Sequence, residues 1–448
     1  MKILITFYHI NNFGGIINNQ EALYAGLKEL GHDVRVKKLM WKEKATAVNS
    51  SRKWKQAPGS MGMYYDQELG WKWNQESLFS YKGKANIARW KEYASKFDLI
   101  IWQIPVPSEN RENAGNMDWL ELYNIPVKQV VYVHDGNLAE ANPHLYEVAP
   151  FLTGAIGVHP CAYHSLKDIP LPRAMAFSPQ MNIEERVAAA DASTERRNGW
   201  FSLQTFKGWK HVEDIVRAVP YMNTDDDDYD KVLAGGGIGR YYMTSPDKTK
   251  PQFHVSPEYD PNCRPEHIGK RIWDVAIQCG MQYLDYIHND ARDKLLHRFK
   301  FLIDPSWSKK YRKVGDHFNR VVIDGLIGGA APIARNFGIS TNVAGQGELF
   351  IPGKNYVMIP WNVYPKDFAA IVNDAMTMPE SRRKELVDAG RELLPHFDYR
   401  ATAQAFIDLA EGRPAGYYKL EGDKGLHNDD VKARSDKLMK FFQTPKGE

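Results

Sequence analysis

The feature that most constrains the fold is an alternation of strands and helices that begins at the N-terminus. The apolar run Ile3–Tyr8 predicts a strand, and the apolar periodicity that follows predicts a helix over 16–30. Gly31 is placed to end that helix, and a second strand is expected over 33–39. Because parallel strands need a helical crossover, this order predicts a doubly wound α/β domain.

The same alternation continues through the first half and starts again near Trp200. Further strands are expected at 98–104, 128–133, 154–158, 200–203, 231–233, 282–286, 299–303 and 331–335, and further helices at 182–198, 211–219, 318–328, 367–376, 379–394 and 399–411. We therefore expect two Rossmann-like domains facing one another across a cleft, over 1–185 and 186–395. Residues 396–448 are expected to return to the first domain as a helix and tail.

Composition excludes several classes of protein. With 43% hydrophobic and 25% charged residues, the 448-residue chain is globular rather than disordered. No apolar run approaches the about 20 residues that span a bilayer, and the N-terminal run is too short for a secretion signal. Three cysteines, an odd and sparse set, favour a reducing compartment. These features predict a cytoplasmic protein that does not act at a membrane.

Basic and aromatic residues concentrate between Arg35 and Lys91. That segment holds thirteen Lys or Arg against four Asp or Glu, so it carries +9 in a chain whose net charge is +3. Five of the twelve tryptophans also lie there. Such a mixture suits a surface that neutralises phosphates and stacks on bases, although a solvated basic flap over a core has the same composition.

Two motifs are weak candidates for metal sites. The acidic run Asp225–Asp228 is typical of a solvated loop, because hard cations need a more rigid set of oxygens. A second candidate has the spacing of half a zinc site and consists of His159, Cys161 and His164. No second His or Cys pair follows at a suitable spacing. We expect no metal.

A glycine turn at Gly14-Gly15 separates the first strand from the first helix. It allows a ligand to approach the backbone, and the helix start offers N–H donors to an anion. The turn does not match G-x-G-x-x-G, which argues against a nicotinamide enzyme.

The most specific motif lies in the second half. A predicted strand ends in Pro305-Ser306, Asp316 and Asp324 follow at a spacing of eight, and a small-residue turn leads to Pro332-Ile333. This pattern resembles the signature of retaining glycosyltransferases of the GT-B fold, family-four type, with Asp in place of both signature Glu residues. The downstream run from Gly345 to Pro360 continues the resemblance.

The resemblance implies roles for these positions. Asp316 would orient the transferred sugar, Asp324 would hold the ribose hydroxyls, and the helix start at Phe318-Asn319-Arg320 would face the diphosphate. Lys207-Gly208 matches the family's Arg-x4-Lys-Gly element, but Ser202 stands at the arginine position. Since the leaving diphosphate needs positive charge, Arg240 or Arg320 is expected to supply what Ser202 lacks.

A further match is His134-Asp135-Gly136 at the end of a predicted strand. The family places a histidine here near the donor sugar, and Asp135 is a candidate for assisting the acceptor hydroxyl. A buried histidine satisfied by the backbone is the alternative.

Within this family the chain is similar to the DNA α-glucosyltransferases of T-even bacteriophages, which act on 5-hydroxymethylcytosine in duplex DNA. The islands that carry this similarity are 97–102, 131–135, 179–183, 206–208 and 308–332. It implies a UDP-sugar as co-substrate, a hydroxymethylated pyrimidine in phage DNA as acceptor, and protection from restriction in the infected host's cytoplasm. Phosphate and base contacts are then expected from Lys37, Lys38, Lys53, Trp54 and Lys55.

Two alternatives remain. A GT-B transferase could act on a polysaccharide, a lipid or an already glycosylated base, but a lipid enzyme typically carries a basic amphipathic helix, and glycines and Pro58 interrupt the basic segment. A non-catalytic DNA-binding protein on a transferase scaffold is the second alternative, and Ser202 is the feature that favours it.

Overall fold

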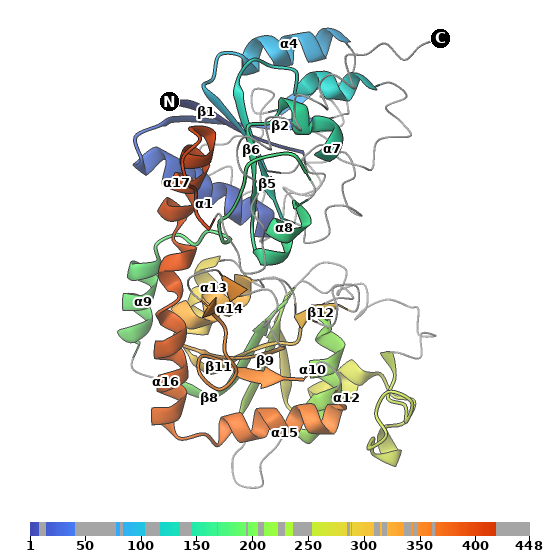
Figure 1. Cartoon of the computed structure of the whole chain (residues 1–448). Helices are drawn as coiled ribbons and strands as arrows, with labels where there is room; N and C mark the ends of the chain where they lie inside the picture. The colour runs from blue at the N-terminus through green and yellow to red at the C-terminus, as the bar shows by residue number, and fades with distance from the viewer. Residues whose placement is uncertain are drawn as a thin grey trace. The chain divides into compact units, whose positions relative to one another are not determined.

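The computed structural model describes residues 1–8, 15–40, 78–80, 84–103, 117–134, 145–167, 169–193, 196–204, 210–222, 229–235, 253–284, 287, 289–308, 314–315, 320–335, 342–343, 347–360 and 363–417. The chain divides into two compact units (Figure 1). Unit 1 holds Met1–Met181, Asn342–Gly347 and the residues from His396 onward, and unit 2 holds Asn182–Thr341 and Glu348–Pro395.

Unit 1 is built on a parallel seven-stranded sheet in the order β3-β2-β1-β4-β5-β6-β7. Its strands are β1 (Lys2–Tyr8), β2 (Asp33–Met40), β3 (Leu78–Ser80), β4 (Leu99–Trp102), β5 (Lys128–Val133), β6 (Gly154–Gly157) and β7 (Arg173–Met175), and its helices are α1 (Gly15–Glu29), α4 (Lys84–Ala94), the 3-10 turns Met117–Leu122 and Ala149–Phe151, α7 (Leu145–Val148), α8 (Pro160–Ser165) and α17 (Tyr399–Ala410).

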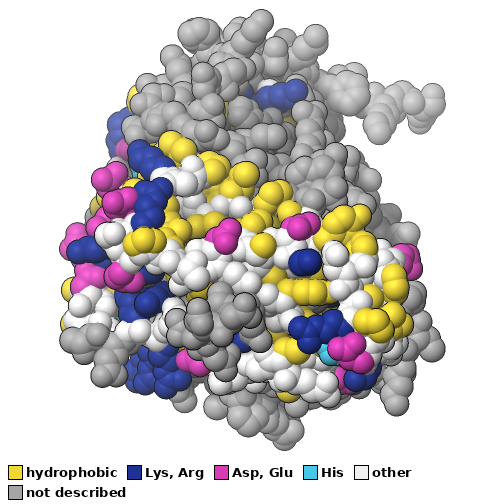
Figure 2. Space-filling view, turned by 90° about the horizontal axis from the view of Figure 1, so that it is seen from below, with side chains coloured by type: hydrophobic (Ala, Val, Ile, Leu, Met, Phe, Trp, Pro, Cys, Tyr) yellow, Lys and Arg dark blue, Asp and Glu magenta, His cyan; other side chains and the backbone are white. Residues whose placement is uncertain are grey.

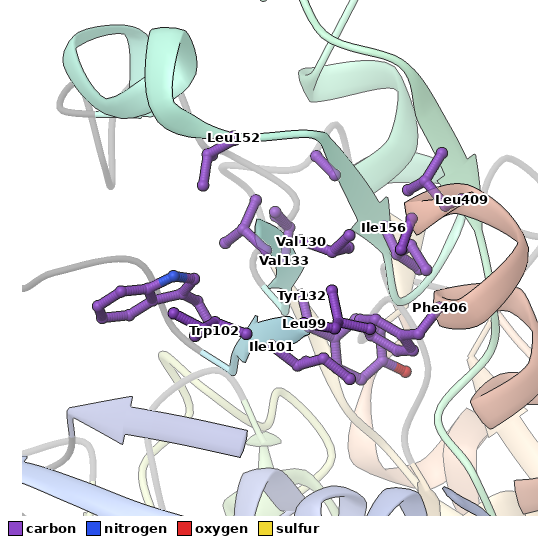
Figure 3. Packing of buried hydrophobic residues seen from close by; sticks show 14 of the residues in the cluster. Leu99, Ile101, Trp102, Val130, Tyr132, Val133, Leu152, Ile156, Phe406 and Leu409 are labelled. Carbon is purple, nitrogen blue, oxygen red and sulfur yellow. The ribbon is translucent and has the colours of Figure 1, made fainter. Parts of the chain in front are cut away.

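The central strands of unit 1 are buried on both faces, which explains their continuous apolar runs. Tyr132 of β5 packs edge-on against Phe406 of α17, with ring centroids 5.1 Å apart, and Figure 3 shows the two together with Leu409 and Ile156. Helix α17 also lies against α1, where a Cβ on Gly26 would come within 2.6 Å of the Tyr399 carbonyl oxygen. The C-terminal helix is therefore part of the unit 1 core.

Unit 2 is built on a parallel six-stranded sheet in the order β10-β9-β8-β11-β14-β17. Its elements are α9 (Ile183–Asp191), β8 (Arg197–Leu203), α10 (Val212–Ala218), β9 (Asp230–Ala234), α12 (Ile272–Gln278), β10 (Met281–Leu284), α13 (Asn289–Leu296), β11 (Phe299–Asp304), α14 (Arg320–Ile327), β14 (Ala331–Arg335), β17 (Val357–Ile359), α15 (Pro365–Met376), α16 (Glu380–Arg391) and the 3-10 turns Val219–Tyr221 and Pro265–His267. The 3-10 turn Leu394–Phe397 precedes α17, and two short ribbons pair β12 (Trp307–Ser308) with β13 (Val314–Gly315) and β15 (Asn342–Val343) with β16 (Gly347–Glu348).

Alternate residues of the unit 2 strands enter two different cores. Trp200 of β8 and Phe301 of β11 pack with α10, α12 and α15 on one face of the sheet. Their neighbours Phe201 and Leu302 pack with α13 and α14 on the other face. Both sheets are therefore covered by helices on two sides, and the prediction of two doubly wound α/β domains is confirmed.

Most predicted elements recur within a few residues of their expected bounds, and the boundary expected at 185 falls at Met181. The helix expected over 182–198 is shorter, because α9 ends at Asp191 and strand β8 begins at Arg197. Among the described elements that were not expected are the strands β3, β7 and β17 and the helices α4, α12 and α13. In the described residues, no helix is both long and apolar enough to cross a bilayer.

Candidate functional site

Both sheets reverse their strand order at one point, between β1 and β4 in unit 1 and between β8 and β11 in unit 2. Open α/β sheets bind ligands outside the carboxyl ends of the strands at such a point. The polar residues that follow these strands are therefore the candidate site residues.

In unit 2 the reversal point carries a buried carboxylate, Asp304, at the end of β11. Its Oδ1 accepts hydrogen bonds from Gln204 Nε2 at 2.9 Å, from the Ser306 backbone N–H at 3.1 Å and from Ser306 Oγ at 2.5 Å. Asp304 is 2% exposed, so these donors replace the water that it has lost. Gln204, the first residue after β8, is thereby fixed to the next strand.

A second carboxylate, Asp214, lies in the first turn of α10. Its Oδ2 accepts a hydrogen bond from Arg335 at the end of β14 at 2.6 Å and lies 3.5 Å from His211 Nδ1. Burial opposes ionisation of Asp214, but the His211 hydrogen bond and the Arg335 charge outweigh it and lower its pKa. His211 has a left-handed backbone with φ of 46°, which is uncommon for a residue other than glycine.

These two contacts bracket the segment that contains Lys207. Gln204 precedes it and His211 follows it, and both are held at the carboxyl edge of the sheet. Ser202, which stands where the family has arginine, lies inside β8 with no exposed surface, and its Oγ donates to the Ile303 carbonyl at 2.8 Å. Ser202 is therefore a structural residue of the sheet.

Asp324 lies in α14 within an ion network that we call the α14 network: Arg186, Arg292, Asp293 and Asp324. Arg186 Nη2 donates to Asp324 Oδ1 at 2.7 Å, and Arg292 Nη1 lies 3.4 Å from Oδ2. Arg186 also forms two bonds of 2.9 Å to Asp293. Burial opposes the ionised form of Asp324, but Arg292, Arg186 and Arg320 together lower its pKa.

Both oxygens of Asp324 are thus occupied by arginines. A ribose held by Asp324, as the family resemblance implies, would share these oxygens with the two guanidinium groups, because each carboxylate oxygen can accept more than one hydrogen bond. Arg320, the first residue of α14, adds a third positive charge near this carboxylate. The network therefore places cations beside the N-terminal half of α14, the end at which an anion is stabilised.

The other end of α14 is held by three arginines, Arg196, Arg383 and Arg391. They donate to the carbonyl groups of residues 326–329, at distances between 2.8 and 3.2 Å. Burial, together with the charges of Arg383 and Arg391, lowers the pKa of Arg196 to about 10. These bonds satisfy carbonyl groups that a helix end leaves open, so α14 is fixed at its C-terminus.

In unit 1, His134 follows β5 and is joined to a chain of neutral side chains. Ser178 Oγ donates to Asn19 Oδ1 at 2.5 Å, Asn19 Nδ2 lies 3.4 Å from His134 Nδ1, and His134 Nε2 lies 3.1 Å from Gln103 Oε1. With these amide orientations, Nδ1 accepts from Asn19 and Nε2 donates to Gln103. The ring also stacks edge-on against Tyr132.

The other predicted residues fall in three groups. Gly15 begins α1, and Lys37 and Lys38 lie in β2, where the Lys37 ammonium is 5.5 Å from the centre of the Tyr93 ring. His159 accepts a hydrogen bond from the Ala162 backbone N–H and so caps α8. Outside the described residues lie Gly14, Lys53, Trp54, Lys55, Asp135, Lys207, Arg240, Asp316, Phe318 and Asn319, together with Asp225–Asp228.

Charge on the described surface is mixed. Figure 2 shows Lys and Arg side chains interspersed with Asp and Glu on the face seen from below. Among the residues that the structure describes, no group of three or more His, Cys, Asp or Glu is arranged to hold a metal ion.

The sequence did not predict the hydrogen-bond and ion-pair partners of His134 and Asp324. Asn19, Gln103 and Ser178 surround His134, and Arg186 and Arg292 hold Asp324. Gln103 could have been identified from the sequence, because it is a polar residue at the end of an apolar strand. No sequence pattern links Arg186 to Asp324, because the two residues are 138 positions apart.

Comparison with known proteins identifies the fold. No family model matches the sequence, and no curated protein matches it. Solved structures do match over 92% of this chain. An α-glucosyltransferase in complex with UDP-glucose and DNA containing an abasic site matches with a TM-score of 0.62, 12% identity and 99% of its own chain covered.

Two bacterial proteins match about as well. HepE of Anabaena, in complex with UDP and glucose, has a TM-score of 0.59 at 12% identity with 100% of its chain covered. A glycosyltransferase from Rickettsia africae has a TM-score of 0.57 at 12% identity with 98% covered. These likenesses show the fold, and the GT-B class predicted from the sequence is confirmed.

Proposed function

We propose that the chain is a retaining glycosyltransferase that moves a sugar from a UDP-sugar to 5-hydroxymethylcytosine, or a related hydroxymethylated pyrimidine, in duplex DNA. The observation that carries this proposal is the likeness of 92% of the chain to glycosyltransferase structures that contain UDP or UDP-glucose, one of them together with DNA.

In this proposal unit 2 binds the nucleotide sugar. The leaving diphosphate gains negative charge as the sugar departs, and preorganised cations stabilise it. Lys207, Arg320 and the N-terminus of α14 provide such charge, with Arg240 as a further candidate. Asp316 orients the sugar. As the new bond forms on the face that the diphosphate leaves, a phosphate oxygen accepts the acceptor's hydroxyl proton.

Unit 1 binds the acceptor. The basic, tryptophan-rich segment between Arg35 and Lys91 supports DNA, because Lys37, Lys38, Lys53 and Lys55 can neutralise phosphates. A base inside a duplex has to leave the stack before its hydroxyl reaches the sugar, and Trp54 is suited to support the opened duplex. His134 and Asp135 would lie near the reacting groups. Such an enzyme would protect phage DNA from restriction in the cytoplasm of the infected cell.

A second candidate keeps the fold and the UDP-sugar but takes a polysaccharide as acceptor. The fold is compatible with this acceptor, because the TM-scores do not separate the DNA-bound α-glucosyltransferase from HepE with UDP and glucose or from the Rickettsia glycosyltransferase. The +9 charge of the 35–91 segment favours DNA over an uncharged polymer.

To test the proposal, the protein is incubated with a panel of UDP-sugars and hydroxymethylcytosine DNA. The DNA is then digested and the masses of its nucleosides are measured. We expect a mass gain of one sugar on the modified base and none on unmodified cytosine DNA. A gain on unmodified DNA, or transfer to polysaccharide alone, would overturn the acceptor.

The catalytic assignment is tested by Asp316→Ala, with Asp274→Ala as control. Asp274 is an exposed carboxylate of α12 in the same unit. Asp316→Ala should abolish transfer and leave DNA affinity unchanged, whereas Asp274→Ala should retain transfer. Full activity of Asp316→Ala would remove Asp316 from the site.

A further inference from the structure

Two buried amides of unit 1 have polar atoms without a hydrogen-bond partner among the described residues: Gln103, which contacts His134, and Gln20, which follows Asn19 in α1. Gln103 has no exposed surface, and its Oε1 is 3.1 Å from His134 Nε2. In the described part of the chain, its Nε2 has no hydrogen-bond partner. A buried donor without a partner destabilises the folded state, because its hydrogen bond to water is lost and is not replaced by one within the protein.

Gln20 is the second such residue. It follows Asn19 in α1 and is fully buried, on the same side of the helix as the core residues Leu23 and Leu27. Within the described ranges, neither its Oε1 nor its Nε2 has a partner. Because buried polar groups are nearly always hydrogen-bonded, an unpaired amide there needs an explanation.

A third buried glutamine shows what a structural amide looks like in the same sheet. Gln129, at the start of β5, donates through Nε2 to the carbonyl groups of Tyr123 at 2.7 Å and Phe151 at 3.1 Å, and its Oε1 accepts from Trp102 Nε1 at 3.0 Å. Gln129 is at the amino end of β5, whereas Gln103 and His134 are at the carboxyl end of the sheet, where ligands bind.

We propose that Gln103 and Gln20 belong to a binding site in unit 1 for an uncharged, hydroxyl-bearing group of the substrate. The inference rests on the proposed function. The side chains concerned are the uncharged amides of Asn19, Gln20 and Gln103 and the hydroxyl of Ser178, which are joined through His134 except for Gln20. A neutral set recognises hydroxyl groups without the desolvation that a phosphate demands.

Together, the unpaired amide atoms of Gln20 and Gln103 can both donate to and accept from a hydroxyl group. A hydroxyl group both donates and accepts. The amide of Gln20 offers one acceptor and one donor group, and Gln103 offers a donor. Such a group could come from the transferred sugar or from the hydroxymethyl arm of the acceptor base, and the binding partners in the experiment separate these sources.

The experiment compares Gln20→Met, Gln103→Met and the control Gln129→Met in the full chain. Methionine keeps the length of glutamine and removes its polar atoms. Thermal unfolding without ligand is measured first. Gln20→Met should unfold at the same or a higher temperature than the unaltered protein, because no bond is lost, whereas Gln129→Met should unfold at a lower temperature.

Calorimetry then gives the affinity for UDP, UDP-glucose and hydroxymethylcytosine DNA. In Gln20→Met and Gln103→Met, UDP should bind as before, and one hydroxyl-bearing ligand should bind about three- to tenfold more weakly. A loss with UDP-glucose assigns the site to the sugar, and a loss with the DNA assigns it to the base. Gln129→Met should bind all three unchanged.

Two results would overturn the inference. One is a lower unfolding temperature for Gln20→Met similar to that of Gln129→Met, which indicates a structural amide bridged by buried water. The other is unaltered affinity of both variants for both hydroxyl-bearing ligands. If the unaltered protein binds neither UDP nor UDP-glucose, the proposed function fails as well, which is a different outcome from binding that the variants leave unchanged.

Discussion

The two units share one strand order and differ in the chemistry at its carboxyl edge. In unit 1 the edge carries amides and a hydroxyl joined in a chain through the imidazole of His134. In unit 2 it carries carboxylates and guanidinium groups, with Asp304 and Arg335 at strand ends and Asp214 and Asp324 in the neighbouring helices. The same topology therefore holds amides and hydroxyls in one unit and ion pairs in the other.

The shared topology places the two candidate sites at equivalent strand ends, and their side chains differ in the chemistry that they offer a ligand. A diphosphate is suited to guanidinium groups, and hydroxyl groups are suited to uncharged donors and acceptors. This difference means that the two regions should respond differently to mutation, pH and salt.

The largest expected effect comes from removing a charge in unit 2. Asp324→Asn leaves Arg186 and Arg292 without a full counter-charge in a buried site, which should lower the free energy of unfolding by about 3–5 kcal/mol. Urea unfolding measures the loss. The control is Glu385→Gln, which weakens an exposed pair with Arg382 and should cost about 1 kcal/mol or less. Equal losses in the two variants would contradict the structural role of the α14 network.

The second prediction concerns pH. Because the folded-state pKa of Asp324 is below its ordinary value of 3.8, its ionised form stabilises the fold above that value. The difference in unfolding free energy between the unaltered protein and Asp324→Asn should be complete between pH 5 and 7. This range lies above the pKa of an unfolded-state Asp, which is about 3.9. It should shrink as the pH falls through the lower folded-state pKa. Unfolding curves at several pH values measure this difference, and a gap that stays constant down to pH 2 would contradict it.

A smaller effect is expected at the C-terminal end of α14. Arg391→Met removes the side-chain donor to the Leu326 and Ile327 carbonyl groups and the ion pair with Asp191, and it should cost about 1–3 kcal/mol of unfolding free energy. Lys384→Met, an exposed residue of the same helix α16, is the control and should cost about 0.5 kcal/mol or less. If both variants unfold alike, the arginines do not stabilise α14.

The smallest effect should come from a single surface lysine of unit 1. Lys37→Ala removes one candidate phosphate contact and should reduce the slope of log DNA affinity against log salt by about 1. Lys366→Ala, in α15 of unit 2, should leave the slope unchanged. A change in slope with Lys366→Ala but not with Lys37→Ala would place the DNA surface in unit 2.

Much of the fold could be predicted from the sequence because both sheets are parallel and buried. Such strands are continuous apolar runs, so β5 and β14 were expected at their observed bounds. Strands β3 and β7 are three residues long, and β3 lies within the basic 35–91 segment, where no long apolar run marks it. Short edge strands are defined by pairing with a neighbour rather than by their own composition.

The candidate site could be predicted only in part. His134 and Asp324 were found because they match a local motif. The residues that determine their chemical state could not be found in this way, because they come from other elements. Asn19 is 115 residues from His134 in sequence, and Arg186 is 138 from Asp324. Such contacts depend on how helices pack on the sheet, which a linear pattern does not contain.

The chain passes between the units four times, after residues 181, 341, 347 and 395. A fragment cut at residue 181 would therefore lack α17, whose Phe406 and Leu409 fill the core above β5 and β6. Dissection of the protein into separately expressed halves has to fuse the terminal helix to the first half through a designed connector. Without that helix the first half would expose its apolar centre and aggregate.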